Sequence, residues 1–464
     1  MSLQGNKLSV KMILKATGGI LVQGNPQASL AGVCADSRSI KPGEVFFALR
    51  GERHDGHQFV PEAVSRGARA VVVKRKVHGI NDISISVIKV RDTLRSLGDL
   101  ANFWRRAHPI PLVAITGSNG KTTTKEMLAE ILAERYKVLK NPGNFNNLIG
   151  LPLSLLKLNS RDQVAVLEMG MNRKGEIRRL AQIAEPNIGI LTNISPVHLE
   201  GLRSLRGVSE AKGELLEVMG KGGKIVFNAD DPMVVELSKR FRGKRTSFGI
   251  KNPADWAATE IRTERGKIAF LLNGPVGETS ISLRLIGKHQ VYNALAAAAA
   301  ASHLGVGLEE IKKALEAFQP PSMRMELVTL GKDIKIINDA YNANPKSMEV
   351  ALSTLEEMKG GRKIAVLGDM WELGDYAVQA HIEIGHRVKK AGVKVLFLLG
   401  KLAPFVAKGA MEAGMDPEAI FIGKDHREIG HHLSLSLKEG DWVLIKGSRI
   451  MKMEGIIETL RDKL

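Results

Sequence analysis

The sequence has one cysteine, few aromatic residues and no long hydrophobic run. Cys34 has no second cysteine to pair with, which excludes an internal disulfide and predicts a reducing compartment, the cytoplasm. Aromatic residues make up 5% of the chain, which disfavours a surface that stacks nucleic-acid bases. No stretch is apolar enough to span a membrane, and residues 1–10 lack the apolar core of a secretion signal. The alanine run 296–301 predicts a tightly packed internal helix instead.

Acidic side chains are outnumbered by basic ones. The 67 Lys and Arg residues against 49 Asp and Glu residues give a net charge of +18, which favours anionic partners. Nucleic acid, an acidic membrane surface and phosphorylated small molecules all have this property. For most of these lysines a basic solvated surface is the simpler interpretation.

The length predicts several domains. At about 100–200 residues per domain, 464 residues exceed one ordinary core, and we expect three domains. Prolines interrupt the pattern at 106–111 and again at 319–322. The alternation of strands and helices predicts an α/β protein with a small N-terminal α/β domain (1–107), a central P-loop domain with a mostly parallel sheet (108–319) and a C-terminal Rossmann-like, doubly wound domain (320–464).

A glycine-rich loop joins a predicted strand, 112–116, to a helix that begins at Lys121. Its backbone N–H groups and the positive end of the helix can bind phosphates, Lys121 can reach the terminal phosphates, and the Thr122 hydroxyl can ligate Mg²⁺. Two residues separate the glycines, where the usual P-loop has four. The alternative is a tight turn whose Lys and Thr are merely solvated. The predicted ATP-binding residues here are Gly117, Ser118, Asn119, Gly120, Lys121, Thr122 and Thr123.

Polar residues follow the strands of the central domain. Glu168 and Asn193 follow the predicted strands 164–167 and 188–192, and ligands gather at the carboxyl ends of parallel strands. A carboxylate beside a P-loop commonly ligates Mg²⁺, whereas the alternative for Glu168 is a charge at a helix N-terminus. Taken alone, a loop histidine such as His198 is more often structural than metal-binding.

Two further polar clusters leave alternatives open. The arginine and hydroxyl of the cluster at 36–38 suit a diphosphate or a carboxylate, but an Asx-type turn with the arginine in solvent explains them equally well. The amides at 144–147 can contact phosphate or peptide groups, although ordinary turn chemistry is the simpler interpretation. The residues concerned are Asp36, Ser37 and Arg38, and then Asn144, Asn146 and Asn147.

In the third domain, strands are predicted at 334–339, 363–367, 394–399 and 441–445. Arg324, just past the second linker, lies where a hinge movement could carry it into the phosphate site. Polar residues again follow the strands, namely Asp339, Asn342, Asn344, Asp369, Glu372, Lys446, Ser448 and Arg449.

Over its whole length the chain resembles the Mur ligase superfamily. The resemblance to the superfamily rests on the three α/β domains and the short Gly-x-x-Gly-Lys-Thr loop. Five further stretches indicate which members of the superfamily the chain is most similar to: 36–38, 143–147, 339–345, 368–374 and 446–449. The last three resemble the members that add D-Ala-D-Ala. The Asp-Asn-Pro-Arg stretch of the members that add a diamino acid is absent from this sequence.

The resemblance implies a role for each matching residue. Lys121 and Thr122 would bind ATP phosphates and Mg²⁺, and Glu168 would ligate Mg²⁺. His198 and Lys212 would serve a second Mg²⁺, because Lys212 matches a lysine that is carbamylated in relatives and so becomes an anionic oxygen ligand. The remaining matches are the nucleotide residues Asn293, Arg324, Asp339 and Asn342, the UDP-sugar residues Asp36, Ser37 and Arg38, and the substrate loop with Asn144, Asn146 and Asn147.

The activity that the resemblance implies is ATP-dependent ligation of D-Ala-D-Ala to a UDP-N-acetylmuramoyl tripeptide through an acyl phosphate, a step of peptidoglycan synthesis. The residues expected to act on the reacting groups are Lys121, His198, Lys212 and Arg324. Asp369, Glu372 and Ser448 are acceptor-site candidates by position alone. We expect a monomer that binds no nucleic acid and has no membrane span.

Three rival interpretations stay open. The first is a related ligase that adds a single amino acid. The second, a nucleic-acid-dependent P-loop ATPase, is favoured only by the net charge. The third, a binding protein without catalysis, is hard to reconcile with Lys121, Thr122, Glu168 and His198 all being present.

Overall fold

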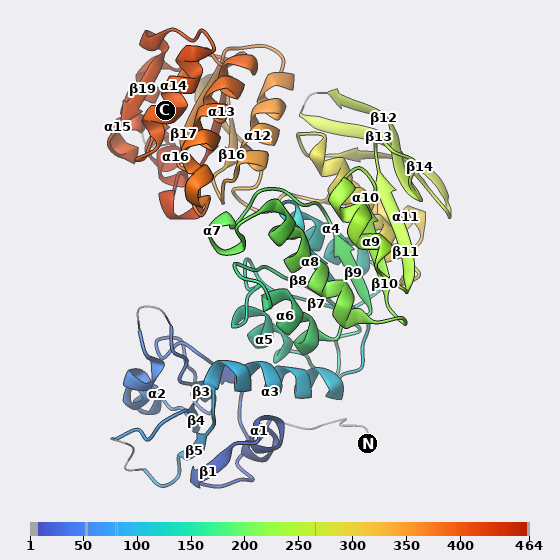
Figure 1. The fold of residues 1–464 in the computed structure, drawn as a ribbon, viewed down its shortest axis with the longest axis vertical. Coiled ribbons are helices and arrows are strands. Elements are labelled where there is room, and N and C mark those ends of the chain that lie inside the picture. Colours follow the sequence, from blue (N-terminus) through green and yellow to red (C-terminus); the bar gives the residue numbers. More distant parts are fainter. Residues whose placement is uncertain (1–7, 52–53, 79, 81, 265, 462–464) are drawn as a thin grey trace.

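The computed structural model describes residues 8–51, 54–78, 80, 82–264 and 266–461, so most of the predicted signal-free start lies outside the described residues. Three sheets follow one another along the chain, with the N-terminal sheet at one end of the molecule and the C-terminal sheet at the other (Figure 1). This arrangement confirms the predicted three-domain α/β class. The exact domain boundaries stay predictions.

The first sheet has five strands in the order β1-β5-β4-β3-β2, with only β1 antiparallel to its neighbour. The predicted strand 45–49 ends at Phe47, because the Leu49 N–H turns back to donate to the Phe47 carbonyl. The elements are α1 (Val10–Thr17), β1 (Ile20–Gln23), β2 (Val33–Cys34), β3 (Val45–Phe47), η1 (Gly56–Phe59), α2 (Val60–Ser65), β4 (Ala70–Val73), β5 (Ser86–Lys89) and α3 (Thr93–Ala107).

The central sheet has nine strands in the order β14-β13-β12-β11-β10-β9-β6-β8-β7. The strands from β7 to β12 are parallel, and the last two pairings are antiparallel, so the sheet is mostly parallel as predicted. Its strands are β6 (Leu112–Thr116), β7 (Val138–Lys140), β8 (Val164–Glu168), β9 (Ile188–Leu191), β10 (Lys224–Asn228), β11 (Lys244–Gly249), β12 (Trp256–Glu264), β13 (Lys267–Gly274) and β14 (Gly277–Leu283).

Helices cover both faces of the central sheet. The alanines 296–301 are buried in α10, which packs with α4 in the same hydrophobic core, so the predicted internal helix is confirmed. The second core contains side chains of α5, α6 and α8. The helices are α4 (Lys121–Ala133), α5 (Gly150–Leu155), α6 (Glu176–Ala184), α7 (Leu199–Leu202), α8 (Leu205–Met219), α9 (Pro232–Lys239), α10 (His289–Ser302) and α11 (Leu308–Ala317).

The antiparallel extension β12–β14 was not predicted. Its signal is the alternation in β13, where Ile268, Phe270 and Leu272 are buried and point to one face. The alternating strands and helices elsewhere in the central domain favour a purely strand-and-helix interpretation, in which consecutive antiparallel strands are not expected.

The third sheet has six strands in the order β15-β16-β20-β17-β18-β19, with only β15 antiparallel. Two separate cores lie on its two faces, which confirms the doubly wound arrangement, whereas the edge strands β15 and β19 were not predicted. The elements are β15 (Glu326–Leu330), η2 (Gly331–Asp333), β16 (Ile334–Asp339), α12 (Pro345–Glu357), β17 (Lys363–Gly368), η3 (Gly374–Tyr376), α13 (Ala377–Lys390), β18 (Val395–Leu399), α14 (Ala403–Glu412), η4 (Pro417–Ala419), β19 (Ile420–Gly423), α15 (His426–Ser436), β20 (Trp442–Lys446), η5 (Arg449–Met451) and α16 (Glu454–Arg461).

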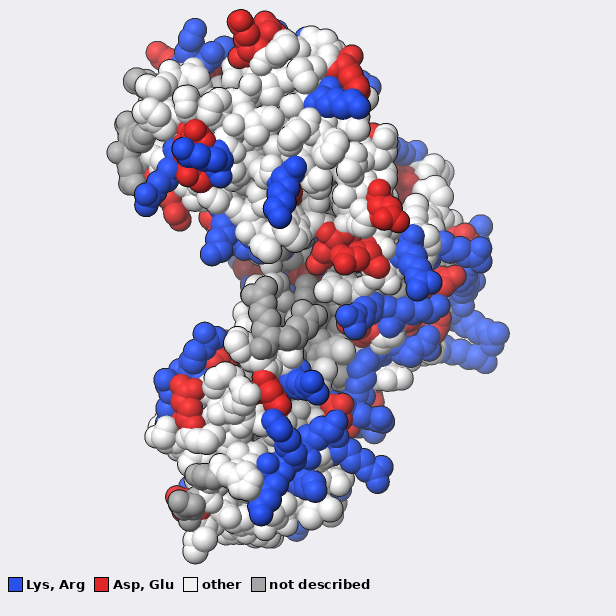
Figure 2. Space-filling view, turned by 60° about the vertical axis from the view of Figure 1, so that its left-hand side comes forward, with Lys and Arg blue, Asp and Glu red and all other residues white. Residues whose placement is uncertain are grey.

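On the face drawn in Figure 2, Lys and Arg side chains are interspersed with Asp and Glu and are densest over the N-terminal and central parts. In the described part of the chain, no helix combines the length and the apolar character that a membrane span needs.

Candidate active site

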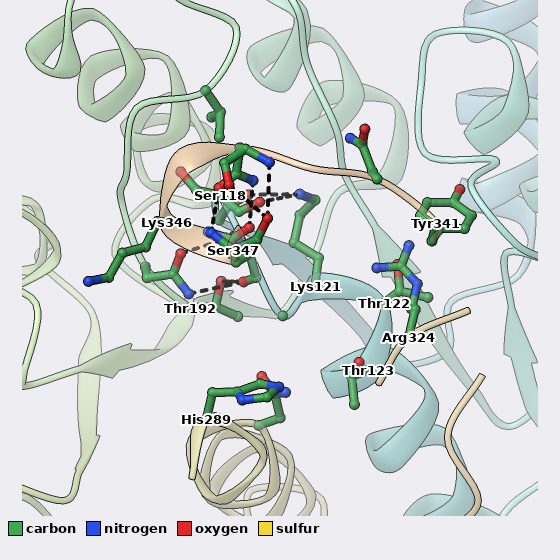
Figure 3. A pocket seen from close by; sticks show the side chains of 18 of the residues that line it. Ser118, Lys121, Thr122, Thr123, Thr192, His289, Arg324, Tyr341, Lys346 and Ser347 are labelled. Atoms are coloured by element: carbon green, nitrogen blue, oxygen red, sulfur yellow. Dashed lines mark hydrogen bonds between the residues drawn. The ribbon is translucent and has the colours of Figure 1, made fainter. Parts of the chain in front are cut away.

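A cavity of about 490 Å³ lies between the phosphate loop and the third domain (Figure 3). Its walls come from the carboxyl ends of β6, β8 and β9, from α10 and from the loop that follows β16. This cavity brings together every residue predicted to bind nucleotide or metal: Gly117, Ser118, Asn119, Gly120, Lys121, Thr122, Thr123, Glu168, His198, Lys212, Asn293, Arg324, Asp339 and Asn342.

The two glycines of the phosphate loop pack so closely against neighbouring residues that a side chain at either position would clash. Gly117 and Gly120 have φ values of 152° and 82°. A Cβ on Gly117 would lie 1.8 Å from the Thr192 hydroxyl oxygen, and one on Gly120 would lie 2.4 Å from the Asn293 amide oxygen. The loop is therefore held tightly between α10 and the residue that follows β9, and α4 begins at Lys121 as predicted.

The ammonium group of Lys121 stays on this loop. It donates hydrogen bonds to the carbonyl oxygens of Gly117 and Ser118, at 2.9 and 3.2 Å (Figure 3). Enclosure in the cavity lowers the pKa of Lys121, the nearby charge of Glu168 opposes the shift, and that of Arg324 adds to it. The lysine cation and the positive end of α4 therefore act on the same part of the cavity.

Thr122 and Glu168 form a buried pair of oxygen atoms beside the loop. The Thr122 hydroxyl donates to a Glu168 carboxylate oxygen at 2.6 Å, and the Asn146 amide donates to the other carboxylate oxygen at 2.7 Å. A hydroxyl and a carboxylate are ligands that suit Mg²⁺, which usually takes further ligands from water and phosphates. The part of the chain that the structure describes contains no group of three or more His, Cys, Asp or Glu that could hold a metal by itself.

A buried lysine, not predicted from the sequence, fixes the loop that carries Asn146. Lys125 is 0% exposed, and its ammonium donates to the carbonyl of Asn141 at 2.7 Å and pairs with Glu126 at 2.9 Å. The side-chain oxygen of Asn141 in turn accepts from the Glu168 N–H at 2.9 Å, and its side-chain nitrogen donates to the Glu168 carbonyl at 3.0 Å. The helix spacing of Lys125 gives no sign of this role, because it resembles that of a solvated helix residue.

His198 and Lys212, the residues implied for a second metal, lie on the same wall. The Nδ1 atom of His198, a residue in the left-handed backbone region with φ 53°, lies 2.5 Å from a carboxylate oxygen of Glu372 in the third domain. Lys212 on α8 is 3% exposed, and no hydrogen bond or ion pair links its ammonium to another described residue. Burial, with the charge of Lys121 as the second cause, lowers its pKa well below the usual value.

The third domain contributes an organised polar wall. Lys446 is 2% exposed and donates to Asp339 at 2.5 Å and to the carbonyl of Asn342 at 2.9 Å, which joins the ends of β16 and β20. The guanidinium of Arg324 lies 3.9 Å from the centre of the Tyr341 ring, a cation–π distance (Figure 3). Arg324 lines the same cavity as the phosphate loop, and its role at the phosphate site stays a prediction.

Asn144 and Asn146 line the cavity, whereas Asn147 does not, since its side-chain oxygen accepts from the N–H groups of Ile149 and Gly150 at the start of α5. The structure also leaves the 36–38 cluster outside the cavity. There the Arg38 side chain is 81% exposed and pairs with Asp36 at 2.8 Å in an Asx-type turn.

Asp36 and Ser37 bond within the first domain. The hydrogen bond from Arg38 lowers the pKa of Asp36, and the Ser37 hydroxyl donates to Glu62 at 2.7 Å. This geometry fits the turn interpretation, so a substrate role for the cluster stays a prediction.

The acceptor-site candidates of the third domain hold loops. Asp369 accepts from the N–H groups of Lys401 and Leu402, at 2.9 and 3.1 Å. The Ser448 hydroxyl accepts from the Trp371 N–H at 2.9 Å. Both side chains thus have a structural role in this domain, and a role in acceptor binding stays a prediction.

The glycine loop before α4, the Thr122–Glu168 pair and the parallel sheet define the class, a P-loop nucleotide-binding protein. Three family models match consecutive parts of the chain: the Mur ligase family catalytic domain over residues 29–105, the Mur ligase middle domain over 115–301, and the Mur ligase glutamate ligase domain over 323–449. The chain belongs to the Mur ligase family.

Full-length relatives and solved structures agree with this assignment. The chain is 36% identical over 458 residues, 98% of each chain, to "UDP-N-acetylmuramoyl-tripeptide--D-alanyl-D-alanine ligase" of Bacillus subtilis, and 35% identical to the Escherichia coli protein of that name, with 94% of each covered. Its fold matches MurF from Acinetobacter baumannii with a TM-score of 0.91 at 31% identity and 99% coverage of both chains. MurF from Thermotoga maritima in complex with ADP matches with a TM-score of 0.83 at 28% identity, covering 93% of this chain and 97% of that one.

Proposed function

We propose that the protein is an ATP-dependent ligase that joins D-Ala-D-Ala to UDP-N-acetylmuramoyl tripeptide, giving the pentapeptide precursor of peptidoglycan. The observation that carries the proposal is one cavity walled by both the phosphate loop and the third domain. A nucleotide on the loop and an acceptor on the third domain can then react in the same space. The names of the full-length relatives supply the substrates.

The reaction would proceed in two steps. An oxygen of the tripeptide carboxylate attacks the γ-phosphorus of ATP, the bond to the β-phosphate oxygen breaks, and ADP leaves. The amine of D-Ala-D-Ala then attacks the acyl carbon, the acyl–oxygen bond breaks, and inorganic phosphate leaves as the amine loses a proton. No side-chain nucleophile is needed, so catalysis depends on positioning and on stabilising negative charge.

The cavity contains groups suited to positioning the substrates and to stabilising negative charge. Lys121 and the N-terminus of α4 would bind the phosphates, and Arg324 would neutralise charge on the group in transfer. Asn293, Asp339 and Asn342 would bind the rest of the nucleotide. Thr122 and Glu168 would hold Mg²⁺, which would supply Lewis-acid stabilisation of the negative charge on the phosphates.

Lys212 is the proposed site of a carbamate. The nitrogen of its neutral amine would attack the carbon of carbon dioxide and form an N–C bond, while one C=O double bond becomes a C–O⁻ single bond and one proton is released, so that a neutral amine becomes an anionic carbamate. Burial and the lowered pKa of Lys212 favour the neutral amine that this step needs. The carbamate and the Nε2 atom of His198 would then serve a second Mg²⁺. Mass spectrometry of the intact protein in bicarbonate should show the mass of one added carbon dioxide, and Lys212→Met should not.

The first domain would bind the UDP-sugar, with Asp36, Ser37 and Arg38 in this role, while Asn144, Asn146 and Asn147 belong to the proposed substrate loop. A diphosphate would have to compete with Asp36 for the exposed Arg38. We also propose that the protein is a monomer that acts in the cytoplasm, where ATP is available.

The test is phosphate release from ATP with Mg²⁺ and UDP-N-acetylmuramoyl tripeptide. D-Ala-D-Ala, single amino acids and no acceptor are compared. Turnover that requires the dipeptide supports the proposal. Turnover with a single amino acid would move the chain to another ligase of the family, and stimulation by RNA or DNA with no response to muramyl peptides would overturn the ligase function.

A further inference from the structure

A hydrogen bond joins the third domain directly to the phosphate loop. The side-chain nitrogen of Asn344, which follows β16, donates to the side-chain oxygen of Asn119 at 2.8 Å. The two residues are 225 positions apart in the chain. Both line the cavity, so the bond lies at the edge of the space where nucleotide and acceptor would meet.

Asn119 is held by the central domain at every other polar position. Its N–H donates to the Asn193 side chain at 3.0 Å, its carbonyl accepts from Thr192 at 2.7 Å and from Asn193 at 3.0 Å, and its side-chain nitrogen donates to Ser195 at 3.1 Å. The side-chain oxygen is therefore presented in a fixed direction, toward Asn344.

Asn344 is equally well fixed by the third domain. Its side-chain oxygen caps α12 by accepting from the Ser347 N–H at 2.9 Å, which leaves the side-chain nitrogen for the phosphate loop. The preceding residues are anchored to β20 and the loop after it, because Lys446 donates to the Asn342 carbonyl and the Ser448 hydroxyl donates to the Ala343 carbonyl. One amide thus links the cap of a third-domain helix to the loop that begins α4.

A second contact lies elsewhere on the same interface. The Glu372 carboxylate reaches Nδ1 of His198, and the Glu372 carbonyl accepts from the N–H of Glu200 at 3.4 Å. Two separate points of the third domain, 28 residues apart in sequence, therefore touch two of the central-domain segments that line the cavity.

We propose that Asn344 is a positioning residue that docks the third domain on the phosphate loop, with Glu372 as the second anchor. This inference rests on the proposed function, because an acceptor held by the third domain can reach an acyl phosphate on the central domain only in the docked arrangement. Asn344 touches neither reacting group and acts through Asn119. One hydrogen bond corresponds to a change of about 2- to 10-fold in the docking equilibrium.

The first test is Asn344→Ser in the full-length protein. Serine caps a helix as well as asparagine does but is too short to reach Asn119. We expect kcat at saturating substrates to fall by about 2- to 10-fold, and the radius of gyration with ADP and Mg²⁺ to exceed that of the unmodified protein in small-angle X-ray scattering. The matched control is Asp425→Ser, which changes the cap of α15 on the opposite face of the third sheet.

Equal kcat and equal radius of gyration for Asn344→Ser and the unmodified protein would overturn the inference. The same loss in Asp425→Ser would also overturn it, because the effect would then come from the helix cap. If Asn344→Ser does not fold, Glu372→Ala and Glu372→Gln test the second anchor. Alanine should lower kcat and expand the molecule, glutamine should restore most of both because its oxygen still accepts from His198, and equal behaviour of the two would contradict the docking role. If the unmodified protein shows no turnover, the proposed function fails, while the scattering comparison still tests docking.

Discussion

Replacing Lys125 by methionine tests whether a buried cation holds the loop at the active site. Methionine keeps most of the volume of the lysine stem and removes the ammonium. The carbonyl of Asn141 then loses its donor, at 2.7 Å, in a place where Asn141 is 0% exposed. Glu126 keeps a partner, since Lys140 lies 2.5 Å away.

Two effects of opposite sign decide how much Lys125→Met changes the free energy of opening this loop. An unsatisfied buried carbonyl costs about 1–3 kcal/mol. Removing a buried charge also removes its desolvation penalty, and for some buried pairs this makes the change neutral. Here only one side of the interaction is deleted and the carbonyl stays buried, so we expect the cost to dominate. At about 1.4 kcal/mol per tenfold change, local opening of the loop 141–147 should increase about 5- to 150-fold.

Amide hydrogen exchange measures this opening directly. The N–H groups of Phe145, Asn146 and Glu168 should lose protection in Lys125→Met, and ATP-dependent turnover should fall because Asn146 no longer orients Glu168. Lys140→Met is the matched control, because Lys140 is 37% exposed and its ion pairs contribute about 1 kcal/mol or less. Unchanged protection in Lys125→Met, or equal loss in both variants, would refute the reasoning.

Three further changes have defined outcomes. Lys121→Ala should reduce ATP-dependent turnover by about 100-fold or more with an unchanged circular dichroism spectrum, and normal turnover would contradict its role. Gly117→Ala should weaken ADP binding, measured by calorimetry, by more than about tenfold, because its Cβ would lie 1.8 Å from the Thr192 hydroxyl. Gly222→Ala is the control and should bind ADP normally, because no atom lies within 4 Å of its Cβ. Burial lowers the pKa of His303 from 6.5 to about 4, so the folded state binds fewer protons than the unfolded state between these pH values. Stability should therefore fall as the pH drops from 6.5 toward 4, by less than the full shift implies because the ring is partly exposed to solvent, and denaturant titration should show a shallower fall in His303→Gln.

The phosphate loop could be predicted because its structure is encoded locally. Gly117 and Gly120 permit the turn, the apolar run before them forms β6, and Lys121 begins α4. Glu168 could be placed beside the loop by a general property of parallel sheets, since β6 and β8 are neighbours with their carboxyl ends at the same edge. Neither inference needed knowledge of a contact between distant residues.

Contacts between distant segments could not be predicted in the same way. Lys125 has the spacing of a solvated helix residue, and only the fold of the following loop shows that it is buried. Asn344 has the sequence signature of a helix cap, which explains its oxygen but gives no information about its nitrogen. That nitrogen is assigned only when the third domain is placed against Asn119, and this placement depends on the packing of whole domains.

The charges inside the cavity give a physical reason for an anionic ligand that the net charge alone does not give. Lys446 is neutralised by Asp339, but among the described residues no ion pair neutralises Lys121, Lys212 or Arg324. Burial and the charge of Arg324 lower the pKa of Lys121, against the opposing charge of Glu168, and burial and the charge of Lys121 lower the pKa of Lys212. A phosphate group near Lys121, or a carbamate on Lys212, would turn this repulsion into attraction. The cavity is therefore electrostatically incomplete by itself, and the binding of anions should raise the stability of the protein as well as supply its substrates.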